Sequence, residues 1–167
     1  MTACPFAETA KKVAVAAGLT SDSTLHTVSR WHLRLAFIGA TIAAQSEDQN
    51  QMTEAGRRGN LADALRNIAI DAASTLFDLD VDDPAAALVT EYERAAVKHP
   101  GMTLDAGGHT DESRFYALAE EVGEVAASLT YDNALETGHS ANTIAEVTQV
   151  GALALAWLTR YQDGTQA

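Results

Sequence analysis

Cysteine and proline are scarce in this chain, and their scarcity limits both its chemistry and its fold. Cys4 is the only cysteine among 167 residues, so an intrachain disulfide is impossible. A lone thiol fits a reducing compartment, and we expect a cytoplasmic protein. Only three prolines are present, which leaves long stretches without a helix breaker. Alanine, the strongest helix former, is abundant.

Basic residues and long apolar runs are also in short supply. The chain has 11 lysines and arginines against 23 aspartates and glutamates, for a formal net charge of −12. Such a chain is repelled by phosphate backbones and anionic lipids, so we expect neither a nucleic-acid nor a membrane partner. No apolar run reaches the length of a membrane span, and the run after Lys12 is too short for the core of a signal peptide. An acidic protein that handles a phosphorylated ligand needs a cation as intermediary, which points to a metal.

Apolar residues recur at helical spacing through most of the chain, and no convincing pair of strands is present. The pattern predicts a single all-α domain over 1–167, a helical bundle. The helices are expected over residues 5–17, 25–45, 61–78, 84–98, 111–129 and 142–162. Polar loops are expected over 46–59 and 131–141. Asp83 and Pro84 mark a helix start, because an acidic cap and a proline both suit the first turn.

Two stretches of the first half can be aligned with two stretches of the second half. Residues 30–40 match 114–124 through an arginine, an aromatic pair, a β-branched residue and a glycine, and 60–76 match 142–158. On this alignment, segment 25–80 is a degenerate first helix pair. The chain is then a fused pseudo-dimer in which one of the two sites carries acids. The first half lacks the acids of the second, since Ala36, Phe37 and Ala40 stand in the places of Glu120, Glu121 and Glu124. Chance matching between alanine-rich helices is the alternative.

A group of acids lies within the predicted helix over 111–129. Glu121 and Glu124 are three residues apart and Glu120 and Glu124 four, so both pairs are neighbours on a helix. No lysine or arginine of this helix lies three or four residues from Glu121 or Glu124. A divalent cation would remove the repulsion, and magnesium prefers oxygen ligands. The alternative is a solvated acidic face, because acids are also favoured near a helix N-terminus.

Glu146 is a further acid, in a predicted helix that is apolar nearly all round. It shares one side of this helix with Leu153, and a carboxylate placed there needs a partner. A cation held jointly with Glu121 and Glu124 would supply that partner. A capping box with Thr143 explains the same residue equally well, so both interpretations stay open.

Other common functional motifs are missing. The histidines show no spacing suited to zinc. A Walker pattern is absent, and Gly107-Gly108 alone is too little for a phosphate loop. No nucleophile elbow or Ser-His-Asp arrangement is recognisable. The acids are therefore the main candidates for chemistry.

The motif Glu120-Glu121-Val122-Gly123-Glu124-Val125, followed about twenty residues later by Glu146-Val147-Thr148-Gln149, resembles the MazG-like nucleoside triphosphate pyrophosphohydrolases. The resemblance covers 92–161 and is closest to the short actinobacterial and phage type. It implies an all-α fold in which helix pairs form four-helix bundles, usually by dimerisation. It also implies hydrolysis of NTPs or dNTPs to the monophosphate and pyrophosphate with Mg²⁺, or with Mn²⁺ in its place. We therefore expect either a homodimer or a pseudo-dimer within one chain.

The resemblance also implies roles for individual residues. The metal ligands would be Glu121, Glu124, Glu146 and Gln149. Glu120 and Glu121 would be the catalytic residues, with Glu120 directing the attacking water. A basic residue near the phosphates is also implied, with Lys98 as the first candidate and Arg114 as the second. Separately from the resemblance, Tyr131 is a candidate for stacking on the base of the substrate. For the first two the alternative is a solvated or helix-end charge, and for the tyrosine it is a loop anchor.

Gln149 departs from the family pattern, which usually has aspartate at this place. A glutamine oxygen can coordinate a metal, but it brings no charge and is a poor base. Two other functions therefore stay open. One is a catalytically degenerate relative that binds nucleotides or a partner protein, and the other is a helical structural or regulatory protein whose acids only face solvent.

Overall fold

The structure is a computed structural model that describes residues 4–17, 24–44, 53–129 and 143–162. Over these ranges the chain is helical and contains no strand, which confirms the all-α prediction. The helices are α1 (Ala7–Ala17), α2 (Thr24–Ala43), α3 (Glu54–Asp78), α4 (Pro84–Lys98), α5 (Asp111–Ser128) and α7 (Thr143–Gln162). The predicted loop over 131–141 and Tyr131 lie outside the described residues.

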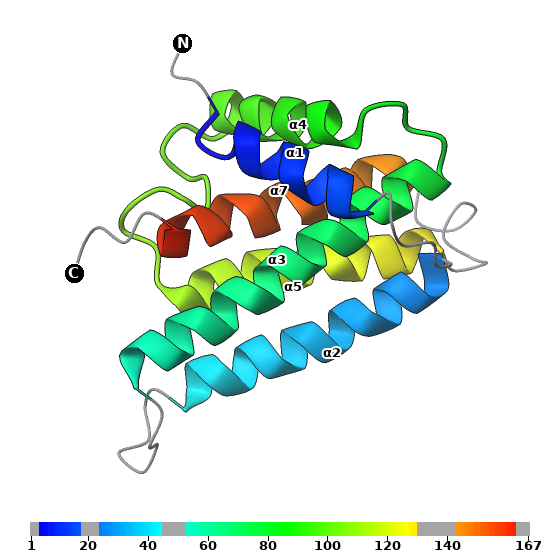
Figure 1. Cartoon of the computed structure of the whole chain (residues 1–167). Helices are drawn as coiled ribbons and strands as arrows, with labels where there is room; N and C mark the ends of the chain where they lie inside the picture. Colours follow the sequence, from blue (N-terminus) through cyan, green and yellow to red (C-terminus); the bar gives the residue numbers. More distant parts are fainter. Residues whose placement is uncertain (1–3, 18–23, 45–52, 130–142, 163–167) are drawn as a thin grey trace.

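Four helices form a closed bundle in which α2 contacts α3, α3 contacts α7, α7 contacts α5, and α5 contacts α2. The most extensive of these contacts is between α3 and α7. Of the other helices in the described ranges, α1 and α4 pack on each other and cover the side of the bundle formed by α3 and α7 (Figure 1). The helix pair of the first half, α2 and α3, therefore packs directly on the pair of the second half, α5 and α7.

The core lies between α3 and α7 and depends on both large and small side chains. Trp31 and Trp157 are fully buried, one in each half of the chain. Gly151 lets α7 approach α3 and α4 closely, because a Cβ at this position would lie 2.5 Å from Leu88 Cδ2 and 3.0 Å from Ala72 Cβ. Among the helices described here, none combines the length and the hydropathy that crossing a bilayer requires.

The prediction of a loop over 46–59 is wrong for its last part, because α3 already begins at Glu54. The loop was predicted because the stretch is polar, and its two glycines also disfavour a helix. The structure offsets their cost with an N-cap, in which the Thr53 side chain accepts a hydrogen bond from Gly56 N at 3.1 Å. Glu54 and Arg57 add an ion pair one turn apart. The extra turns bring Arg58 against α7, where its guanidinium lies 5.8 Å from the centre of the Tyr161 ring.

The other helix boundaries follow the predicted ones within one or two residues. The Asp83 side chain accepts a hydrogen bond from Ala86 N at 3.0 Å, and Pro84 is the first residue of α4. At the start of α5, Thr110 accepts a hydrogen bond from Ser113 N at 3.2 Å. These local caps explain why the starts of α4 and α5 are readable from the sequence.

Candidate metal and nucleotide site

The candidate acids lie between α5 and α7, which run antiparallel with their ends joined by polar contacts. At one end, the hydroxyls of Ser128 and Thr143 are 3.1 Å apart. At the other end, Tyr161 interacts electrostatically with Asp111. These contacts hold the two helices in register, so residues near 121–124 of α5 face residues near 146–149 of α7.

This register brings together three of the predicted metal ligands, Glu121, Glu124 and Glu146, which we call the acidic cluster. One carboxylate oxygen of each lies within 4.8 Å of the others. Glu124 is exposed, whereas Glu121 and Glu146 are partly buried. The Oε2 atom of Glu121 is buried and has no hydrogen-bond partner among the described residues. An unmet acceptor beside two further carboxylates is the arrangement that a cation satisfies.

The surroundings of Glu121 in the acidic cluster give its carboxyl group an unusual pKa. Burial first, and then the negative charges of Glu124 and Glu146, together raise the pKa of Glu121 to about 7. Arg94 of α4 carries an opposing charge that interacts electrostatically with Glu121. The hydrogen bonds of the Arg94 guanidinium, however, go to Glu91, with Nε at 2.7 Å and a terminal nitrogen at 2.6 Å. The acidic cluster therefore has an excess of negative charge.

Gln149, the fourth predicted ligand, lies beside the acidic cluster and contacts it through its amide. Its Nε2 atom donates a hydrogen bond to Glu146 Oε2 at 2.7 Å. The amide thus orients one carboxylate without adding to the negative charge. An aspartate here would meet Glu146 as a like charge. Coordination of a metal by Gln149 stays a prediction.

A cavity of about 420 Å³, the main pocket, opens beside the acidic cluster. Its size is in the range of small-ligand sites. The predicted residues Lys98, Glu120, Glu121 and Gln149 all line it. The rest of the wall combines apolar and polar side chains: Glu91, Tyr92, Arg94, Ala95, His99, Met102, Thr103, Leu104, Ala117, Ala152, Leu153 and Ala156. The main pocket therefore has an acidic end, a basic edge on α4 and an apolar body.

Arg94 is a pocket residue that the sequence reasoning missed as a candidate for substrate binding. It precedes Lys98 by four residues on α4, so both side chains lie on the same face of the helix. This spacing was visible in the sequence. The direction in which this face points was not visible in the sequence, because it depends on how α4 packs on α7.

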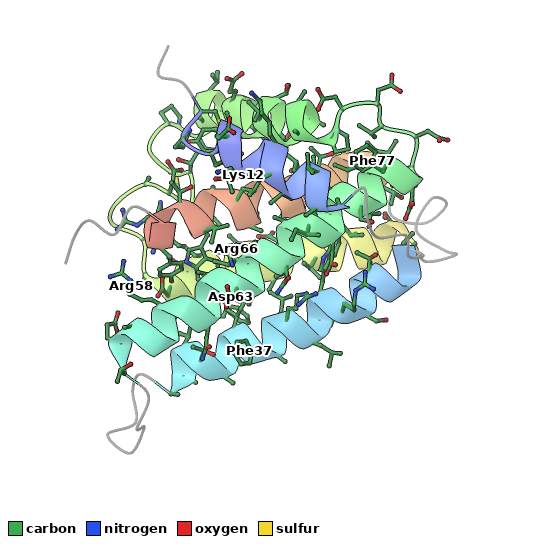
Figure 2. The ribbon with its side chains drawn as sticks, viewed as in Figure 1. Lys12, Phe37, Arg58, Asp63, Arg66 and Phe77 are labelled. Atoms are coloured by element: carbon green, nitrogen blue, oxygen red, sulfur yellow. The ribbon has the colours of Figure 1, made fainter. Side chains whose placement is uncertain are left out.

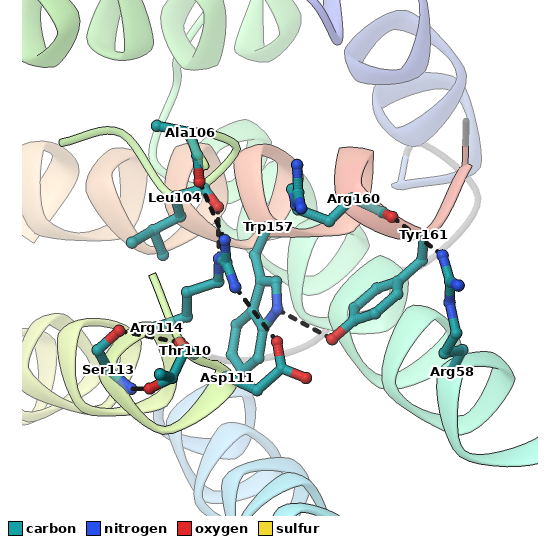
Figure 3. A network of polar contacts seen from close by, with 10 residues as sticks. All are labelled: Arg58, Leu104, Ala106, Thr110, Asp111, Ser113, Arg114, Trp157, Arg160 and Tyr161. Atoms are coloured by element: carbon teal, nitrogen blue, oxygen red, sulfur yellow. Dashed lines mark hydrogen bonds and ion pairs between the residues drawn. The ribbon is translucent and has the colours of Figure 1, made fainter. Parts of the chain in front are cut away.

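Arg114, a predicted phosphate ligand, lies elsewhere. Its side chain is buried, and it is not among the residues that line the main pocket. Its guanidinium donates hydrogen bonds to the carbonyl oxygens of Leu104 and Ala106 and pairs with Asp111 (Figure 3). The structure therefore brings together Lys98, Glu120 and the acidic cluster but not Arg114. Tyr131 lies outside the described residues.

A second pocket, of about 290 Å³, lies between α2 and α3 in the first half of the chain. Phe37, Ala64 and Asn67 line it, and Figure 2 shows Phe37 on α2 with Asp63 on the neighbouring α3. In the alignment of the two halves, these three residues correspond to Glu121, Glu146 and Gln149. The second pocket thus has an aromatic ring and a methyl group at the positions where the main site has carboxylates.

The chain was compared with known proteins, and the geometric observations above remain the basis for proposing a function. No family model matches the chain, and no curated protein or solved structure is significantly similar to it. The resemblance of 92–161 to MazG-like enzymes is therefore a prediction that rests on the quoted motifs. The geometry of the acidic cluster and of the main pocket is independent of that resemblance.

Proposed function

We propose that this protein is a Mg²⁺-dependent, MazG-like pyrophosphohydrolase that converts nucleoside triphosphates to the monophosphate and pyrophosphate. The observation that carries the proposal is the convergence of Glu121, Glu124 and Glu146 within 4.8 Å beside the main pocket. Two helices contribute to the acidic cluster, so the arrangement depends on the fold and not on one helix face. A pocket with a basic edge next to these acids supports a phosphorylated ligand.

The residues of the acidic cluster fit a hard divalent cation. All three side chains offer carboxylate oxygens, which Mg²⁺ prefers. The buried Oε2 of Glu121, without a partner in the described part of the chain, is an acceptor that such a cation would satisfy. Glu121, Glu124 and Glu146 would hold the ion. When bound, Mg²⁺ would supply positive charge to phosphate oxygens and lower the pKa of water bound to it.

The chain's own residues account for the remaining needs of the reaction. Lys98 and Arg94, one turn apart at the edge of the main pocket, offer positive charge to the phosphates. Exposed Glu120 lines the same pocket and can take the proton of the attacking water. The water oxygen adds to the α-phosphorus, and the bond from this phosphorus to the α–β bridging oxygen breaks, releasing pyrophosphate. Apolar wall residues such as Leu153 can receive the base.

The alternative is a degenerate relative that binds nucleotides or a partner without hydrolysis. The hydrogen bond from Gln149 to Glu146 favours it, because this amide replaces a carboxylate and already occupies one oxygen of Glu146. The aromatic and alanine residues of the second pocket support the related idea that the first half is a degenerate copy. A structural or regulatory protein with solvent-facing acids remains a third candidate.

Pyrophosphate release from a panel of NTPs and dNTPs with Mg²⁺ tests the proposal. We expect activity in the wild type, and a loss of at least about 100-fold in Glu121→Gln, which removes a ligand charge. Glu112→Gln is the matched control, since Glu112 is an exposed acid in the first turn of α5, outside the acidic cluster. It should keep wild-type activity.

Gln149→Asp separates the enzyme from its degenerate relative. If the wild type is inactive and Gln149→Asp hydrolyses a triphosphate, the degenerate relative is the correct interpretation. Titration calorimetry with Mg²⁺ then distinguishes a metal-binding protein from a structural one. A wild type that neither hydrolyses triphosphates nor binds Mg²⁺ would contradict both nucleotide-related functions.

A further inference from the structure

The buried guanidinium of Arg114 holds the loop between α4 and α5 from the inside. Only 4% of this residue is exposed. Its Nε atom donates to the Leu104 carbonyl at 2.7 Å, and a terminal nitrogen donates to the Ala106 carbonyl at 3.0 Å (Figure 3). A planar guanidinium can bridge two carbonyls two residues apart, whereas a lysine ammonium has no such fork. The shape of the loop is therefore tied to one side chain of α5.

Arg114 is itself held in place at the bundle end. Its other terminal nitrogen lies 3.4 Å from Asp111 Oδ1, and Asp111 interacts electrostatically with Tyr161. Trp157 Nε1 donates to the Tyr161 hydroxyl at 3.2 Å. Figure 3 shows Asp111 of α5 beside Tyr161 of α7, and its dashed contacts join Arg114 to Asp111 and Trp157 to Tyr161. The anchor of the loop is consequently part of the helical bundle.

The loop is also held from α4, and its ends can turn sharply. Tyr92 donates a hydrogen bond from its hydroxyl to Asp105 Oδ2 at 3.0 Å. Gly101 and Gly108 have positive φ angles of 75° and 90°, which only glycine adopts readily. Between these turns, the backbone N–H of Ala106 donates to a loop carbonyl at 2.9 Å. The segment between the glycines is thus a defined surface and not a loose connection.

This segment forms one wall of the main pocket through Met102, Thr103 and Leu104. Leu104 is buried, and Met102 is 63% exposed. The wall carries no charge, so it suits the nucleoside part of a substrate better than the phosphates. The charged side chains of the pocket, such as Lys98 and Glu121, come from helices instead.

We infer that Arg114 is a positioning residue, which fixes the 102–104 wall against the nucleoside part of the substrate and does not contact the phosphates. The inference rests on the proposed function for its substrate. It predicts that loss of the guanidinium fork weakens nucleotide binding and leaves the acidic cluster intact. Metal affinity and the chemical step should therefore change little.

Arg114→Lys tests the role, because lysine keeps the charge but cannot bridge both carbonyls. We expect KM for the best triphosphate to rise roughly tenfold, with kcat and Mn²⁺ affinity within about threefold of wild type. Amide hydrogen exchange at Ala106 should accelerate at least about tenfold, while exchange in α3 and α7 stays unchanged. If hydrolysis is too slow to measure, the affinity for a non-hydrolysable triphosphate analogue replaces KM.

Two further variants keep the test decisive. Met102→Ala removes a wall side chain that is largely exposed, so it should raise KM without affecting folding. Arg66→Lys is the matched control, since Arg66 also pairs with an aspartate three residues earlier, Asp63, but on the exposed face of α3. It should leave KM and exchange at Ala106 unchanged.

The failure of this inference is distinguishable from failure of the proposed function. A wild type that neither hydrolyses nor binds a triphosphate contradicts the proposed function and the substrate named here. If the wild type hydrolyses or binds a triphosphate and Arg114→Lys has an unchanged KM, only the positioning role is contradicted. Unchanged exchange at Ala106 in Arg114→Lys would contradict that role whether or not the protein is an enzyme.

Discussion

Glu121 links the stability of the protein to pH at the residue scale. Its pKa is raised from an ordinary 4.5 to about 7, first by burial and then by its acidic neighbours. Between these two values the folded protein keeps a proton that the unfolded chain releases. The contribution of Glu121 to stability is therefore fully present below pH 4.5 and is lost as the pH rises through 7.

We predict that the metal-free protein loses stability between pH 5 and pH 8, and that Glu121→Gln flattens this part of the curve. Because Glu121 is only partly buried, solvent screening limits the effect to about 1 kcal/mol. Denaturant unfolding in the presence of EDTA measures it. Mg²⁺ should restore the loss at pH 8 in the wild type but not in Glu121→Gln, and Glu112→Gln should behave as wild type. An identical pH dependence in wild type and Glu121→Gln would contradict the burial of this carboxyl.

Asp71 is the second residue with a large expected effect, because it joins α3 to α2. Its two oxygens accept hydrogen bonds from Arg30 at 3.4 Å and from Arg34 Nε at 3.1 Å. Asp71 is 9% exposed, so its charge depends on these two partners.

Asp71→Asn should destabilise the protein by about 2–3 kcal/mol, since two guanidinium groups would then face a neutral amide. Asp63→Asn breaks an exposed pair with Arg66 and should cost less than about 1 kcal/mol. Urea unfolding of both variants checks the difference. Equal effects would mean that the contact of Asp71 with α2 contributes no more than a surface ion pair.

At the scale of elements, the approach of α7 to α3 and α4 depends on Gly151. Gly151→Ala would place a methyl group 2.5 Å from Leu88 Cδ2 and 3.0 Å from Ala72 Cβ. Both neighbours are fully buried, so they have little room to move. We predict a destabilisation of about 1–3 kcal/mol, measured by thermal or urea unfolding.

Gly59→Ala is the matched control within α3, because nothing lies within 4 Å of a Cβ at Gly59. It should stabilise the protein by up to about 1 kcal/mol, as alanine favours a helix over glycine. Combining Gly151→Ala with Leu88→Ala should cost less than the sum of the two changes, since the second removes the clash. A neutral Gly151→Ala would show that α7 can move away from α4 at little cost.

Element boundaries could be predicted where local interactions decide them. Asp83 and Thr110 are caps, and Pro84 is the first residue of α4; these signals act within one turn, so the starts of α4 and α5 were readable from the sequence. The start of α3 was not, because its glycines favour a loop while contacts of Arg58 with the distant Tyr161 and Arg160 favour the helix. These long-range contacts add to the local Thr53 cap, and together they outweigh the preference of the glycines.

At the scale of the whole molecule, α3 and α7 join the two halves through an extensive contact, so we expect the halves to unfold together. Each half supplies one buried tryptophan, Trp31 on α2 and Trp157 on α7. We predict that Trp31→Phe and Trp157→Phe each unfold with one midpoint, the same by fluorescence of the remaining tryptophan as by far-UV circular dichroism. Two midpoints within one variant would show that the helix pairs unfold separately.

The sequence alone determined the helical class, most helix boundaries and the acids worth testing, because these depend on spacing along a single helix. Glu121 and Glu124 share a face through their separation of three residues, whatever lies opposite. Only the tertiary structure decided that Glu146 joins them, that Arg94 lines the main pocket and that Arg114 lies buried beneath a loop. These outcomes depend on which helices meet and in what register, and contacts between distant segments set that register.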